Sequence, residues 1–107
     1  MGKKKLLGII ENYRQELEKK VDVEKIILYG SYAYGKPHKG SDIDLIIISS
    51  DFKKMNSLKR LEYLSLARIK TLDPIEAIGY TPEEIKNYKN SVFLCPIMEK
   101  GKVVFKK

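Results

Sequence analysis

The sequence contains one cysteine, one histidine and no tryptophan in 107 residues. A single thiol excludes an internal disulfide and any metal site built from several thiolates. Long apolar runs are also missing, because the most apolar segment, residues 43–48, contains Asp44 and is far shorter than the ~20 residues of a membrane span. The apolar residues behind the lysines at positions 3–5 are too interrupted for a secretory signal. These absences predict a cytoplasmic protein without a membrane segment.

The composition and charge limit the kind of protein further. Hydrophobic residues make up 43% and charged residues 33%, which is typical of a globular chain, and this length predicts a single domain over residues 1–107. A net charge of +7 would suit a nucleic-acid partner. Five of the lysines lie at residues 3–5 and 106–107, where charged side chains are usually solvated, and no aromatic RNA-binding motif is present. Nucleic acid is therefore disfavoured as a direct ligand.

Helical periodicity alternates along the chain with short β-branched runs. The pattern predicts helices over residues 3–20 and 57–70, from Thr81 onward and near 91–99, and strands over 24–29, 43–49, 74–79 and 102–105. Both faces of the first strand are apolar, so it is expected to be buried on two sides. Residues 30–40 hold three glycines and a proline and are predicted to be a loop. The alternation indicates an α/β (α+β) fold with a sheet of about four strands.

Two aspartates open the second strand. Asp42 and Asp44 are two residues apart, so both carboxylates are expected on one face of the strand, next to the apolar residues 45–48. Two like charges in such a place repel each other, and a divalent cation such as Mg²⁺ removes the conflict. The alternative, aspartates that simply cap the mouth of the strand in solvent, stays open for this pair taken alone.

A glycine–serine pair follows the first strand. Gly30 permits close approach of a ligand, and the backbone amides with the Ser31 hydroxyl can donate to phosphate oxygens. Alone, such a pair is also a common turn. Combined with the two aspartates, it indicates a nucleoside triphosphate held between amide donors and a metal site.

The segments GSYAYG, residues 30–35, and SDIDL, residues 41–45, resemble the signature of the DNA polymerase β-like nucleotidyltransferase superfamily. Over residues 3–105 the chain is similar to the minimal nucleotidyltransferases of prokaryotes, which act as antitoxins beside HEPN-domain toxins. The resemblance implies a nucleotidyltransferase fold, a mixed sheet flanked by helices. It also implies an Mg²⁺-dependent enzyme, with two ions, that transfers AMP from ATP to a tyrosine of a HEPN-type toxin.

Residue by residue, the resemblance assigns Gly30 and Ser31 to phosphate binding and Asp42 and Asp44 to metal binding and catalysis. For the family's third carboxylate, a catalytic and metal-binding residue on a later strand, the candidate is Glu76, where aspartate is the commoner type.

Members of the family often carry arginine at the position of Tyr34. Lys36 or Lys39 in the same loop is the candidate replacement for contact with the nucleotide phosphates.

Two function hypotheses remain. The first is the adenylyltransferase, and the second is a non-catalytic nucleotide-binding module that neutralises its partner by contact. The helix over 57–70 has a second apolar edge, Tyr63, Leu66 and Ile69, on which a partner could dock under either hypothesis. Whether the chain forms a homo-oligomer stays open.

Overall fold

The computed structural model describes residues 1–38 and 40–107. Its elements along the chain are α1 Lys3–Leu17, β1 Lys25–Tyr29, α2 Ser31–Tyr34, β2 Ile43–Ile48, a 3₁₀ turn Ser50–Lys54, α3 Ser57–Thr71, β3 Ile75–Tyr80, α4 Pro82–Lys86, a 3₁₀ turn Tyr88–Asn90, α5 Leu94–Lys100 and β4 Lys102–Lys106. Each predicted helix and strand is present, with ends that differ by a few residues.

In the described residues, four strands form one sheet in the order β3-β2-β1-β4. β1 pairs antiparallel with β2 and β4, and β2 pairs parallel with β3. The sheet is therefore mixed, as the resemblance implied, and β3 is one of its two edge strands. The α/β fold with about four strands is confirmed.

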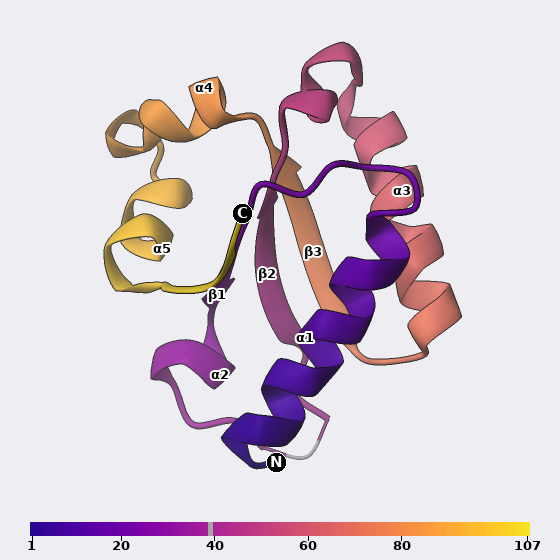
Figure 1. The fold of residues 1–107 in the computed structure, drawn as a ribbon. Coiled ribbons are helices and arrows are strands. Elements are labelled where there is room, and N and C mark those ends of the chain that lie inside the picture. Colours follow the sequence, from indigo (N-terminus) through magenta and orange to yellow (C-terminus); the bar gives the residue numbers. More distant parts are fainter. Residues whose placement is uncertain (39) are drawn as a thin grey trace.

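Helices cover both faces of the sheet (Figure 1). α1 and α3 cover one face, where Tyr13 of α1 is fully buried and donates its hydroxyl to the Leu64 carbonyl of α3 at 2.9 Å. The shorter α4 and α5 cover part of the other face, with Leu94 and Ile97 packed on Ile27 and Ile46. Strand β1 is thus buried on both sides, as its two apolar faces predicted.

Two elements depart from the prediction, and the second departure has a simple physical reason. The loop predicted for residues 30–40 begins with the one-turn helix α2. The last helix starts at Leu94 instead of near residue 91, and Pro96 falls in its first turn. An amide there has no intrahelical acceptor, so proline is tolerated.

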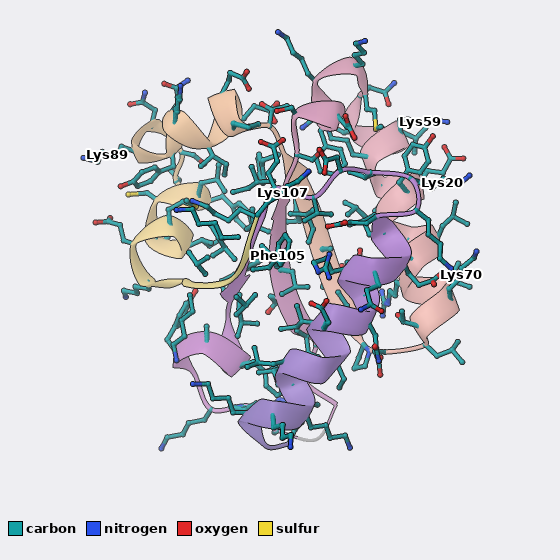
Figure 2. The ribbon with its side chains drawn as sticks, viewed as in Figure 1. Lys20, Lys59, Lys70, Lys89, Phe105 and Lys107 are labelled. Atoms are coloured by element: carbon teal, nitrogen blue, oxygen red, sulfur yellow. The ribbon has the colours of Figure 1, made fainter. Side chains whose placement is uncertain are left out.

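Lysines lie at the periphery of the molecule, among them Lys20, Lys59, Lys70 and Lys89 (Figure 2). Lys107 pairs with Asp22 at 2.5 Å.

No helix in the described part of the chain is long and apolar enough to cross a membrane.

Candidate active site

The register of the sheet brings three polar side chains into one row. Tyr29 of β1 is opposite Asp44 of β2, and Asp44 is opposite Glu76 of β3. Directly opposed residues share a face of a sheet, and the next row on this face is Ile27, Ile46 and Ile78. The polar row therefore lies at the edge of the apolar layer that α5 covers. Asp42 precedes β2 by one residue.

Asp44 lies in electrostatic conflict with its neighbours. Its carboxyl pKa is raised above the ordinary value, first by partial burial and then by the negative charges of Asp42 and Glu76. The structure thus brings the two predicted aspartates and the predicted third carboxylate close enough to repel one another. Such a conflict is characteristic of sites that hold a cation.

Tyr29 completes the row and was not anticipated as part of it. Burial raises the pKa of its phenol to about 12, with further contributions from Asp44, Tyr80, Glu76 and Tyr34. The hydroxyl is therefore a neutral hydrogen-bond donor beside the carboxylates. Its ring packs edge-on against Phe93, with centroids 6.2 Å apart. Alternation along β1 placed Tyr29 on this face, but only the register with Asp44 reveals the contact.

Gly30 lets the end of β1 approach the aspartates. Its φ is +74°, a region that other residues rarely adopt, and a Cβ at this position would collide with Oδ2 of Asp44. The Gly30 carbonyl accepts hydrogen bonds from the amides of Ala33 and Tyr34, at 3.0 and 3.1 Å, which start α2. The amides of Ser31 and Tyr32 begin this turn, where backbone donors have no intrahelical acceptor. The predicted glycine–serine pair thus presents donors next to the carboxylates.

Glu76 is exposed, and its Oε2 lies 3.5 Å from Nη1 of Arg68 on α3. In the described residues, no three His, Cys, Asp or Glu side chains are arranged to hold a metal ion. Asp42 and Asp44 nevertheless fit a divalent cation, because their two carboxylates lie close enough to repel each other and because carboxylate oxygens are suitable ligands for Mg²⁺. Glu76 would join them by leaving Arg68.

Comparison with known proteins identifies the family. The family described as a nucleotidyltransferase domain matches residues 10–104. The chain belongs to this family.

Several relatives agree with this assignment. A protein of Methanocaldococcus jannaschii named "Putative protein adenylyltransferase" is 26% identical, over 98% of this chain and 75% of its own. A crystal structure of a "putative nucleotidyltransferase" from Sulfolobus solfataricus has a TM-score of 0.69 at 20% identity, covering 96% of this chain and 82% of that one. A structure described as a tri-AMPylated Shewanella oneidensis HEPN toxin in complex with MNT antitoxin has a TM-score of 0.57 at 18% identity, covering 94% and 73%.

Of the two lysines predicted to contact phosphate in this nucleotidyltransferase domain, the structure describes one. Lys36 is exposed in the segment after α2, and within the described residues it forms no ion pair. Lys39 lies outside the described residues. Tyr34, at the position where relatives often carry arginine, is 48% exposed.

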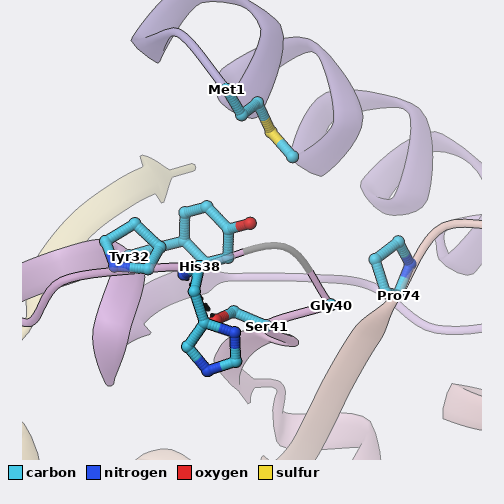
Figure 3. Close-up of a pocket in the computed structure, with 7 residues that line it drawn as sticks. Met1, Tyr32, His38, Gly40, Ser41 and Pro74 are labelled. Carbon is cyan, nitrogen blue, oxygen red and sulfur yellow. Dashed lines mark hydrogen bonds between the residues drawn. The ribbon is translucent and has the colours of Figure 1, made fainter.

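A cavity of about 450 Å³ lies beside the same loop (Figure 3). Its lining comes from the start of the chain, α2, the segment after α2 and the turn before β3: Met1, Tyr32, Pro37, His38, Gly40, Ser41 and Pro74. The His38 amide donates to Oγ of Ser41 at 2.9 Å. None of the three carboxylates lines this cavity, so it adjoins the candidate site without containing its polar row.

Proposed function

We propose that this nucleotidyltransferase domain transfers AMP from ATP to a tyrosine hydroxyl of a HEPN-type toxin and so acts as an antitoxin. The observation that carries the proposal is the convergence of Asp42, Asp44 and Glu76 beside the Gly30–Ser31 turn. The names of the relatives support it, since one is called a protein adenylyltransferase and another is an antitoxin bound to an AMPylated HEPN toxin.

Mg²⁺ is the proposed cofactor, as two ions. Asp42 and Asp44 would be the first ligands, and Glu76 the third once it leaves Arg68. When bound, the ions would neutralise the charge of carboxylates and phosphates and would make the acceptor hydroxyl more acidic.

The side chains and amides of this chain have separate roles. The amides at Ser31 and Tyr32 would hold phosphate oxygens in place, because the first amides of a helical turn have no acceptor within that turn. The acceptor oxygen attacks the α-phosphorus, the bond to the β-phosphate breaks, and pyrophosphate leaves with the electron pair. The proton of the acceptor hydroxyl passes to the Glu76 carboxylate. Lys36 or Lys39 would contact the departing pyrophosphate from the loop.

The test is a transfer assay with labelled ATP, Mg²⁺ and a HEPN-type protein as acceptor. We expect AMP on a tyrosine of that protein and no label with Asp44→Asn. Asp51→Asn is a matched control, since the same change falls just after the opposite end of β2, where the Asp51 carboxylate accepts a hydrogen bond from the Asp22 amide at 2.8 Å. If Asp44→Asn inhibits the toxin as well as the wild type does, without added mass, the chain is instead a binding module.

A further inference from the structure

The outer edge of β3 carries backbone groups that the sheet does not use. β3 is an edge strand that pairs only with β2 in the described residues. The carbonyls of Pro74 and Tyr80 accept from Ile43 and Ser49 of the β2 side, at 2.8 and 3.0 Å. Because backbone groups alternate in direction along a strand, the odd-numbered residues of β3 direct their N–H and C=O groups away from the sheet.

Two of these outward groups already have partners. The Gly79 carbonyl accepts a hydrogen bond from Nη1 of Arg60 on α3 at 3.2 Å. The Ile75 amide donates to the Asp73 carbonyl at 2.8 Å. Between them, the N–H and C=O of Ala77 make no hydrogen bond within the described residues. A donor and an acceptor on one residue of an edge strand can pair with an added strand.

A groove lined by apolar side chains, and also by Arg60 and Glu84, runs beside this edge. A cavity of about 360 Å³ between α3 and β3 is lined by Leu61, Leu64 and Ala77, among others. The same three residues also line a smaller cavity, of about 40 Å³, that includes Arg68 and Glu76. Leu61 is 54% exposed. The groove therefore leads along the open edge to the proposed third carboxylate.

We propose that an extended segment of the acceptor protein adds to β3 as a further strand and places its hydroxyl at Glu76. The proposal rests on the proposed function for the identity of that hydroxyl. Opposed residues share a face, so a side chain beside Ala77 enters the groove under α3. The next side chain along, beside Glu76, lies on the carboxylate face. The edge thus selects a segment in which a tyrosine stands between two apolar residues.

The binding test is an NMR titration of the full-length chain with a capped heptapeptide that has valine–tyrosine–valine at its centre. We expect the amide signals of Ala77 and Gly79 to shift at millimolar peptide. Ala77→Pro removes only an outward donor, which an edge strand tolerates, and should abolish the shifts, whereas Ala77→Ser retains them. Absence of shifts in the wild type, or shifts confined to other residues, overturns the proposal.

The transfer test compares two exposed leucines, one in the groove and one on α1. Leu61→Gln, in the groove, should lower AMP transfer to the HEPN-type protein ~10-fold or more, the scale of a central interface residue. Leu7 of α1 is 38% exposed and lines neither cavity of the groove, so Leu7→Gln should retain transfer within ~2-fold, since surface changes away from an interface have small effects. Binding of ATP with Mg²⁺ should be unchanged in both.

The outcomes separate the two proposals. Equal transfer by both leucine variants and the wild type overturns the strand-addition proposal and leaves the proposed function intact. A wild-type chain that transfers no AMP overturns the proposed function, while the peptide titration still decides whether the edge binds a strand. If the variants alter only the mass of the chain in sedimentation, the edge pairs with a second copy, and the proposal is wrong.

Discussion

β3 and the segment that follows it carry a charged cluster at each end, and the two clusters are built in opposite ways. After the last residue of β3, Arg60 of α3 meets Glu84 of α4 at 2.8 Å. The same guanidinium donates to the carbonyls of Phe52, Met55 and Gly79. Burial alone would raise the pKa of Glu84, but hydrogen bonds from Arg60 and from Thr81 lower it. Each charged group in this cluster is paired with a group of opposite charge and also forms hydrogen bonds with the backbone.

At the start of β3, three carboxylates face one another instead. The pKa of Asp44 is raised by burial, by Asp42 and by Glu76. Within the described residues, the one cation that forms an ion pair with any of these three carboxylates is Arg68, at 3.5 Å from Glu76. Unpaired like charges destabilise a fold. The comparison teaches that the Arg60 cluster is internally neutralised, whereas the carboxylate cluster keeps a repulsion that the proposed cation would remove.

The largest expected effect concerns the carboxylate cluster. If Glu76 accepts the proton of the attacking hydroxyl, Glu76→Gln should lower AMP transfer by ~10² or more, the usual scale for the loss of a general base. Binding of ATP should stay within severalfold, as calorimetry would measure. Glu83→Gln, an exposed position on α4, is the matched control. Transfer unaffected by Glu76→Gln would make Glu76 a structural residue.

The paired cluster should respond through stability. Arg60→Gln removes the ion pair with Glu84 and the donor to the carbonyls of Met55 and Gly79, while the Phe52 carbonyl keeps its hydrogen bond from the Met55 amide. Loss of a partly buried network of this kind should lower the free energy of unfolding by about 2 kcal/mol. Urea denaturation monitored by circular dichroism measures the change. A loss below about 0.5 kcal/mol, the scale of an exposed ion pair, would show that the cluster is no more than a surface contact.

The fold was largely predictable from local signals. The period of apolar residues located α1, α3 and the four strands, and the Thr81-x-x-Glu84 pattern, with Pro82 at the first helical position, marked the start of α4, where a capping box is observed. Spacing alone placed Asp42 near Asp44, and alternation placed Glu76 on the face of its strand that also carries Ile78. The resemblance then supplied the link between them.

What the sequence could not provide depends on contacts between distant segments. The register that sets Tyr29 beside Asp44, the pairing of Arg68 with Glu76 and the four acceptors of Arg60 all join residues of different elements. No local pattern encodes such pairings, because they follow from how whole strands and helices pack. The outward N–H and C=O of Ala77, which make no hydrogen bond within the described residues, were equally unpredictable, because the position of β3 at the sheet edge follows from how the strands pack.

A smaller effect should appear when the conflict in the carboxylate cluster is removed. Because the pKa of Asp44 is raised in the folded chain, its protonated form contributes stability at low pH, and that contribution is lost as pH rises through the raised pKa. Without metal at pH 7, Asp44→Asn should therefore be more stable than the wild type, by about 0.5 kcal/mol after solvent screening.

This gain should vanish as the pH falls below the ordinary aspartate value of 3.8. Urea denaturation at several pH values measures it, and Mg²⁺ should stabilise the wild type but not the variant, because only the wild type would bind the ion. Asp51→Asn provides the comparison, since its carboxylate accepts a hydrogen bond from the Asp22 amide and no gain is expected. Equal stability of Asp44→Asn and wild type at pH 7 would argue that the aspartates are well solvated.

The smallest expected effect separates the two arginines of α3. Arg68 and Arg60 each pair with a glutamate, but the Arg68 side chain is 46% exposed and its ion pair measures 3.5 Å, against 15% and 2.8 Å for Arg60. Exposed ion pairs contribute little, so Arg68→Gln should change the free energy of unfolding by less than about 0.5 kcal/mol. The same urea experiment on Arg60→Gln gives the reference. A loss for Arg68→Gln as large as that for Arg60→Gln would mean that Glu76 is held firmly in a structural pair, and Glu76 could then not leave Arg68 to join a metal ion.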